Sequence, residues 1–276
     1  MGKAALANYL LWTYLLQSTR TQRRRLSYLQ RHQKQETAPA TECGVTFIMQ
    51  ELSFKIIARI KSDFREKFGI PRQSGIVQNL RAAIRFEPEF RNADALRGLE
   101  GFSHLWIVWI FSENIRSTWS PTVRPPRLGG NKRLGVFATR SSFRPNPIAL
   151  SCVKIEQIHL DGAEGPEIIV SGADLMDGTP IVDIKPYLPY TDAHPEATGG
   201  FADAVRQNKL HVKESELLNK LPREKRTALI EVLEQDPRPA YQNDPERVYG
   251  FSFANYEIKF KVQNDELEIV GLEVKA

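Results

Sequence analysis

The most constraining feature of this sequence is a series of short apolar runs, rich in aromatic and β-branched residues, that turn residues separate at short intervals. The run at 102–111, FSHLWIVWIF, is nearly continuous, which is typical of a strand buried on both faces. The expected strands are 54–61, 83–86, 102–111, 134–139, 148–160, 167–174 and 180–184. Runs of this length and spacing predict a mainly β fold, either a barrel or a sandwich.

The pattern changes after a stretch at 195–200 that contains proline and glycine and is expected to be a linker. The elements expected beyond it are helices at 212–221 and 223–235, and a hairpin of 249–262 and 267–274 with its turn at 263–265. We therefore predict three parts: an N-terminal extension at 1–48, a β domain at 49–195 and a small α+β domain at 200–276.

The first 48 residues differ from the remainder. Ala4 to Leu16 is mostly apolar, Arg23 to Arg25 follow, and no acidic residue comes before Glu36. An acid-free, arginine-rich leader is typical of an organelle transit peptide. The favoured alternative is that Met49 is the natural start, because the strand pattern begins just after it. Under that alternative, fold and activity do not need residues 1–48.

Charge is distributed unevenly along the chain. Residues 114–155 hold eight Lys or Arg and no carboxylate, and five prolines stiffen this segment. Residues 156–203 hold ten carboxylates, and Lys185 is the only Lys or Arg among them. Arginine on a preorganised loop suits phosphate or carboxylate, since its fork of donors is fixed and always charged. A basic face beside an acidic one suggests a polyanion partner and a second, different ligand.

Several classes of site are excluded. Two cysteines, Cys43 and Cys152, cannot build a metal site or a disulfide framework, and they suggest a reducing compartment. No apolar run reaches the length that spans a bilayer. The dinucleotide fingerprint, the Walker loop, H-E-x-x-H and G-x-S-x-G are all missing from the sequence. His104 lies inside an expected strand. It is interpreted as a core or edge residue whose hydrogen bonds are satisfied, rather than as a catalytic base.

Three loops carry the remaining polar motifs. PRQ at 71–73 follows a strand, and Arg140 and Arg144 flank a turn that closes with PNP. DLMDGTP at 174–180 is expected to be a turn between two strands, with Gly178 free to adopt positive φ and the backbone exposed. From composition alone, the favoured interpretation of DGTP is a hairpin turn. The favoured interpretation of RPPR at 124–127 is a solvated surface loop.

Together these strings resemble the TsaA-like family, the TrmO type of tRNA methyltransferase. The matching strings are PRQ (71–73), ADALRGLEGFSHLW (93–106), PTVRPPRLGG (121–130), GVFATRSSFRPNPI (135–148), DLMDGTPIVDIKPYLP (174–189) and QDPRPAY (235–241). Their order and spacing fit across roughly residues 51–276, and the leader lies outside the resemblance.

The resemblance implies an S-adenosylmethionine enzyme with a single-sheet β-barrel catalytic domain, acting as a cytoplasmic homodimer. The implied reaction methylates the N6 nitrogen of N6-threonylcarbamoyladenosine, next to the anticodon of threonine tRNA. The implied cofactor contacts are Pro71, Arg72, Gln73, Ser112, Glu113, Arg140, Leu175, Asp177, Gly178, Thr179 and Pro180.

These residue types suit such roles. Arg140 can pair with the cofactor's carboxylate, and Asp177 can accept from its ammonium or ribose hydroxyls. The arginines expected to bind tRNA phosphates are Arg124, Arg127, Arg133 and Arg144. The carbamoyl group makes the acceptor N–H acidic, so a base is useful. Asp183 and Tyr187 are the expected proton acceptors, with Asp177 as a third candidate.

Two alternatives stay open. The same chemistry could act on a different acceptor, because acceptor choice depends on loops. A non-catalytic RNA-binding or regulatory module would use the basic loop alone. The presence of PRQ, Arg140 and DGTP together favours catalysis, since a pure binder would not need a cofactor set.

Overall fold

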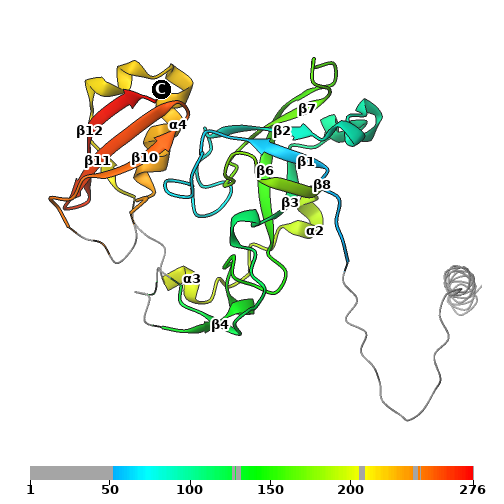
Figure 1. The fold of residues 1–276 in the computed structure, drawn as a ribbon, viewed down its shortest axis with the longest axis horizontal. Coiled ribbons are helices and arrows are strands. Elements are labelled where there is room, and N and C mark those ends of the chain that lie inside the picture. Colours follow the sequence, from blue (N-terminus) through cyan, green and yellow to red (C-terminus); the bar gives the residue numbers. More distant parts are fainter. Residues whose placement is uncertain are drawn as a thin grey trace, which may run out of the picture. The chain divides into compact units, whose positions relative to one another are not determined.

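The computed structural model of this chain describes residues 52–125, 128, 132–204, 209–238, 242 and 244–275 (Figure 1). The account below concerns the unit Ser53–Ala276. The expectations for residues 1–48 lie outside the described residues, as do Arg127 and residues 239–241 of QDPRPAY.

Six antiparallel strands close a barrel in the order β1-β2-β7-β6-β3-β8. They are β1 (Ala58–Lys61), β2 (Arg81–Phe86), β3 (His104–Ile110), β6 (Ile148–His159), β7 (Glu167–Ser171) and β8 (Pro180–Pro186). Alternate residues of each strand point inward, so Ile60, Ile84 and Ile107 are fully buried in one core. The predicted mainly β fold with a single-sheet barrel is confirmed.

Short elements connect the barrel strands. They are the 3-10 helices η1 (Pro88–Phe90), η2 (Ala93–Leu96), η3 (Leu99–Gly101), η4 (Ser112–Asn114) and η6 (Val136–Ala138), and the strands β4 (Thr122–Val123) and β5 (Leu134–Gly135). The short helices α2 (Pro189–Asp192) and α3 (Phe201–Ala204) follow β8, the last barrel strand in the sequence. In the covered part of the chain, no helix combines the length and apolar character needed to cross a membrane.

Two details of the barrel strands differ from the sequence prediction. The run 102–111 was expected to be buried on both faces, but β3 buries only alternate residues, such as Leu105 and Ile107. The residues of the opposite face are half-buried, and there the Tyr187 ring lies 5.7 Å from that of Trp106, tilted by 47°. The strand expected at 134–139 is limited to β5, which pairs with β4 in a separate two-stranded sheet.

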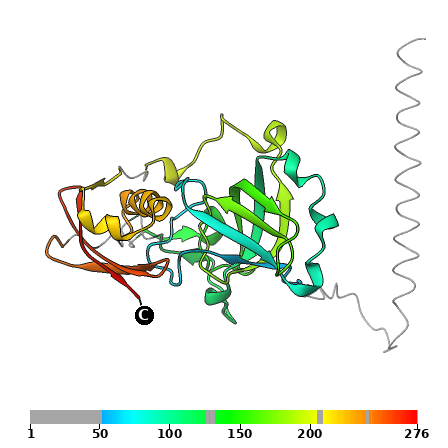
Figure 2. The same ribbon diagram turned by 90° about the horizontal axis from the view of Figure 1, so that it is seen from above.

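The C-terminal part contains a second sheet in the order β10-β11-β12-β9. Its elements are β9 (His211–Val212), η7 (Glu216–Lys220), α4 (Arg223–Glu234), β10 (Tyr249–Phe253), β11 (Tyr256–Gln263) and β12 (Glu266–Val274). Figure 2 shows α4 lying against these strands, and its Leu229 and Val232 share a core with Phe251 and Phe260. The predicted α+β character of this part is confirmed.

Two of its predicted elements were wrong in detail. Residues 212–221 were expected to form a helix, but His211 and Val212 pair with β12, and only the short η7 is helical. The strand expected at 249–262 is interrupted by a turn, where Ala254 adopts a φ of 52°. At β9 the long-range pairing with β12 overrides the local pattern, whereas β10 and β11 form a tight hairpin around Ala254.

The connection between β1 and β2 is built into the C-terminal core. Phe64, Val77 and Leu80 are buried in the same cluster as the C-terminal sheet. Gly69 has a φ of 92°, and a Cβ atom at this position would lie 2.4 Å from the Phe251 ring. Packing of this loop on the second sheet therefore sets the position of PRQ, which lies directly after Gly69 and Ile70.

Candidate active site

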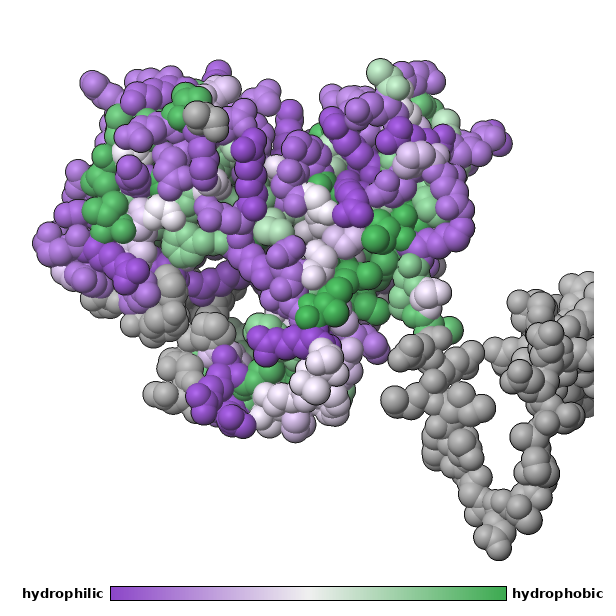
Figure 3. Space-filling model, in the orientation of Figure 1, coloured by the Kyte–Doolittle hydropathy of each residue, from purple (hydrophilic) through white to green (hydrophobic). Residues whose placement is uncertain are grey.

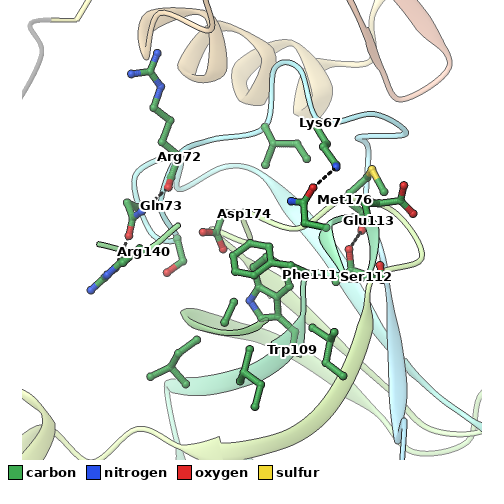
Figure 4. A pocket seen from close by; sticks show the side chains of 18 of the residues that line it. Lys67, Arg72, Gln73, Trp109, Phe111, Ser112, Glu113, Arg140, Asp174 and Met176 are labelled. Carbon is green, nitrogen blue, oxygen red and sulfur yellow. Dashed lines mark hydrogen bonds between the residues drawn. The ribbon is translucent and has the colours of Figure 1, made fainter. Parts of the chain in front are cut away.

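A cavity of about 710 Å³ lies beside the barrel, and segments far apart in the sequence converge on it (Figure 4). One wall comes from the β1–β2 loop, including PRQ, and another from the end of β3 with η4. The loop around Arg140, the start of β6 and the residues after β7 complete it. A cavity of this volume has the size of a small-molecule site.

The cavity brings together many of the predicted cofactor residues. Those lining it are Pro71, Arg72, Gln73, Ser112, Glu113, Arg140 and Thr179. Leu175 is instead buried in the barrel core, and Pro180 is buried at the start of β8. Asp177 and Gly178 border a separate hollow of about 250 Å³. The predicted contacts are therefore divided between two concave surfaces and the buried interior.

The DGTP segment is a turn, as the sequence predicts. Gly178 adopts a φ of 78°, and its carbonyl accepts from Arg59 at 3.1 Å. Asp177 is engaged by Lys61 Nζ at 3.0 Å and by the backbone N–H of Ser62 at 2.9 Å. Both oxygens of this carboxylate therefore have partners from the β1 strand and the loop that follows it.

Gln73 and Arg140 form a polar pair at the cavity wall. The Arg140 guanidinium donates to the side-chain oxygen of Gln73, and Gln73 Nε2 donates to the carbonyl of Arg72 at 2.6 Å. Figure 4 shows these side chains side by side. Because Gln73 is held by the backbone, it restrains the exposed arginine close to the cavity, where a carboxylate ligand could be paired.

Arg72 points elsewhere. Its Nη2 donates to the carbonyl oxygens of Asp236 and Arg238, at 3.2 and 3.0 Å, and Figure 4 shows the side chain extending away from Gln73. Asp236 in turn accepts from the Arg238 guanidinium at 2.8 and 2.9 Å. The strings PRQ and QDPRPAY thus meet in space. A cofactor role for Arg72 stays a prediction.

Asp174 is a cavity residue that the sequence reasoning missed. Ser151 Oγ donates to its Oδ1 at 2.6 Å, and Trp109 Nε1 donates to Ser151 Oγ at 2.9 Å. Burial raises the pKa of Asp174, while the Ser151 hydrogen bond and the positive charge of Arg140 oppose that rise. The sequence signal available was its place as the first residue of DLMDGTP, three residues after the end of β7.

The two predicted proton acceptors do not line this cavity. Asp183 pairs with Lys185 at 2.8 Å and accepts from the N–H of Ile184 at 2.9 Å. The Tyr187 ring lies 5.7 Å from that of Trp106, which does line the cavity. Tyr187 is therefore separated from the cavity by one side chain. The catalytic role of both residues stays a prediction.

The basic segment presents arginines in different settings. Arg124 and Arg133 are exposed, and Arg133 donates to the Thr122 hydroxyl at 3.3 Å. Arg144 donates to the carbonyls of Thr139 and Ser141, at 3.0 and 3.4 Å, so it supports the loop that carries Arg140. Of the four predicted RNA-binding residues, Arg124 and Arg133 are the described ones that face solvent.

Large apolar side chains are also exposed in the basic segment. Trp119 and Phe137 are 54% and 73% exposed, and their rings lie 6.1 Å apart. Leu150 is exposed as well and contributes to the cavity lining. On the face drawn in Figure 3, hydrophobic residues gather over the barrel while most of the surrounding surface is hydrophilic. Such patches are typical of binding surfaces.

The sequence of this chain is similar to those of known tRNA methyltransferases. The family model of the tRNA-methyltransferase O N-terminal domain matches residues 59–193, and the TrmO C-terminal domain matches 204–275. The tRNA (adenine(37)-N6)-methyltransferase of Escherichia coli (strain K12) is 41% identical over 237 residues, covering 82% of this chain and 99% of that protein. The Eikenella corrodens protein of the same name is 47% identical over 164 residues, covering 59% of this chain and 92% of its own.

Two further matches come from Pseudomonas aeruginosa. A putative S-adenosylmethionine-dependent methyltransferase from this organism is 41% identical over 220 residues, covering 76% of this chain and 93% of that protein. A crystal structure of TrmO from the same species aligns with a TM-score of 0.66 at 33% identity, covering 82% of this chain and 99% of that chain. The likeness therefore spans both the barrel and the C-terminal part.

Proposed function

The chain belongs to the TrmO family of tRNA methyltransferases, and from this we propose that it transfers a methyl group from S-adenosylmethionine to the N6 nitrogen of adenosine 37 in tRNA. The family membership that the sequence predicted is confirmed by both family models. The observation that carries the proposal is the convergence of PRQ, Ser112 with Glu113, and Arg140 on one cavity. These segments are those that the resemblance assigns to the cofactor.

The residues present fit this cofactor. Arg140, oriented by Gln73, would pair with its carboxylate, and Trp109 with Phe111 offers an aromatic wall for its adenine. When bound, the cofactor supplies a methyl group activated by the sulfonium. Thr179 is the DGTP residue that borders the cavity. We keep Leu175, Asp177, Gly178 and Pro180 as proposed contacts of the same ligand.

Chemically, one N–C bond forms as one S–C bond breaks, and the N6 proton must leave. Holding the acceptor in line with the reacting groups is the main contribution expected of the protein. Tyr187, behind Trp106, and Asp183 on β8 remain the proposed proton acceptors.

More specifically, we propose that the methylated nucleoside is N6-threonylcarbamoyladenosine in the anticodon arm of threonine tRNA. The basic segment supports a polyanionic partner, since Arg124 and Arg133 are exposed there. A site that pairs with the threonyl carboxylate leaves an arginine desolvated and unpaired when that group is missing, which slows transfer by orders of magnitude. We further propose a cytoplasmic homodimer.

The test is transfer of labelled methyl to threonine tRNA with and without the threonylcarbamoyl group, at matched salt. Transfer to the modified tRNA alone supports the proposal. Comparable rates on both substrates would favour the same chemistry on another acceptor. Binding of tRNA with no transfer to either would favour the non-catalytic RNA-binding module. Sedimentation of the purified protein tests the dimer separately.

A further inference from the structure

Two opposite charges lie on the wall of the main cavity. Arg140 is positive and is held by Gln73, and Asp174 is negative and is held by Ser151. The positive charge of Arg140 lowers the pKa of Asp174 against the effect of burial, so the two groups are near enough to interact. In an α-amino acid, the carboxylate and the ammonium sit on the same carbon. A protein can therefore bind both groups of such a zwitterion with an anion close to its carboxylate-binding arginine.

Asp177 does not fill this role in the structure. Sequence reasoning expected it to accept from the cofactor's ammonium or from its ribose hydroxyls, but Lys61 and the Ser62 N–H already engage its two oxygens. It borders the smaller hollow and not the cavity that contains Arg140. Glu113 also lines the main cavity, but it is exposed to solvent and therefore well hydrated. Asp174 is the more buried of the two cavity carboxylates, and a cation there is attracted more strongly.

The orientation of Asp174 is set by a chain of donors. Trp109 donates to Ser151, and Ser151 donates to Oδ1 of Asp174. A carboxylate has about four acceptor positions, so it can accept further donors after this bond. Figure 4 shows Asp174 between the Gln73–Arg140 pair and the aromatic side chains of Trp109 and Phe111. The carboxylate is thus fixed in place before any ligand binds.

From this geometry we propose that Asp174 binds the α-ammonium of the amino-acid moiety of the ligand, as the anionic partner of Arg140. The inference rests on the proposed function, because it assumes an S-adenosylmethionine-type ligand. Asp174 then selects ligands that carry a free α-amino group. Ser151 acts as a positioning residue, since it touches the carboxylate and not the ligand.

The experiment compares two ligands that differ in this group. S-adenosylhomocysteine carries the α-amino acid, whereas 5′-methylthioadenosine keeps the adenosine and sulfur but lacks it. Equilibrium dialysis with labelled ligands measures both, including weak binding. Asp174→Asn should weaken S-adenosylhomocysteine binding by roughly ten- to hundred-fold, the scale of a charged hydrogen bond. Binding of 5′-methylthioadenosine should be unchanged.

Two further variants test whether the selective loss of binding is specific to the Asp174 carboxylate. Glu113→Gln removes the other cavity carboxylate and should leave the ratio of the two affinities unchanged. Ser151→Ala keeps the charge of Asp174 but loosens its orientation, so it should produce a smaller loss than Asp174→Asn, again only for S-adenosylhomocysteine. Thermal unfolding of each variant confirms that it is folded.

Three results would overturn the assignment. An equal loss for both ligands in folded Asp174→Asn would place the residue near the adenosine. Unchanged S-adenosylhomocysteine binding with a reduced kcat would make it a proton acceptor. Glu113→Gln reproducing the selective loss would transfer the role to Glu113. If the unaltered protein binds neither ligand, the proposed function fails and this inference fails with it.

Discussion

Arg72 Nη2 donates a hydrogen bond to the carbonyl oxygen of Arg238 at 3.0 Å, across 166 residues of sequence. The same nitrogen donates to the Asp236 carbonyl at 3.2 Å. The β1–β2 loop that carries PRQ is therefore tied to the loop after α4. Since Gln73 lies next to Arg72 and orients Arg140, the wall of the cavity depends on the C-terminal part of the chain.

Arg72→Ala should lower the free energy of unfolding by about 2 kcal/mol, because two carbonyl groups lose a charged donor. Denaturant unfolding measures this change. Arg65→Ala is a suitable control, since Arg65 makes an exposed bond to Asn255 and should cost much less. Equal effects of the two substitutions would contradict a special role for the Arg72 contacts.

Arg140→Ala should weaken S-adenosylmethionine binding by about 1.5–3 kcal/mol, the range of a charge-assisted contact. Calorimetry on the purified protein checks this value. Arg116→Ala removes an arginine of the same segment, which lies over the Phe143 ring, and should leave the affinity unchanged. Unchanged binding in Arg140→Ala would remove this residue from the cofactor site.

The double substitution of Arg124 and Arg133 by Ala should weaken tRNA binding and reduce its salt dependence. Each lost phosphate contact removes about 0.7–0.9 from the slope of log K against log salt, so the slope should fall by up to about two units. Filter binding at several salt concentrations measures it. Arg85→Ala, at a residue paired with Glu164 and Glu167, should have little effect. An unaltered slope in the double variant would exclude these contacts.

Gly69→Ala should destabilise the protein strongly. Gly69 and Gly98 have nearly the same φ, 92° and 90°, so Ala carries a similar backbone strain of about 1–2 kcal/mol at either position. Only at Gly69 would the new Cβ meet a ring, 2.4 Å from Phe251, whereas nothing lies within 4 Å at Gly98. The difference in unfolding free energy between the variants isolates this clash, which should add about 1–3 kcal/mol.

The stability of Asp174→Asn should depend on pH in a definite direction. Burial raises the pKa of Asp174 above its ordinary value of 3.8, so the folded state binds this proton more tightly than the unfolded chain does. The ionised group therefore disfavours folding above its folded pKa, and this penalty disappears as pH falls below 3.8. The free energy of unfolding of Asp174→Asn, relative to that of the unaltered protein, should therefore be higher at pH 7 than at pH 3. A difference that does not vary with pH would contradict the raised pKa.

Local pattern was sufficient to locate the barrel strands, although by itself it left a barrel and a sandwich open. Alternation of apolar residues predicted strands that bury Ile60 and Ile84, because side chains in a strand point to opposite faces. It failed at 212–221, where a helical spacing of leucines yielded to pairing between Val212 and Leu267. Strand pairing depends on a partner more than fifty residues away, and no local window contains that information.

The sequence by itself determined the barrel strands, the turn at Gly178 and the family, through patterns and strings that are local in the chain. Only the tertiary structure decided which carboxylate faces the cavity. Asp177 is engaged by Lys61, 116 positions away, while Asp174, three residues earlier, is oriented by Ser151 at the cavity wall. The partners of a charged side chain come from packing between distant segments, so neighbouring residues of one motif can have different roles.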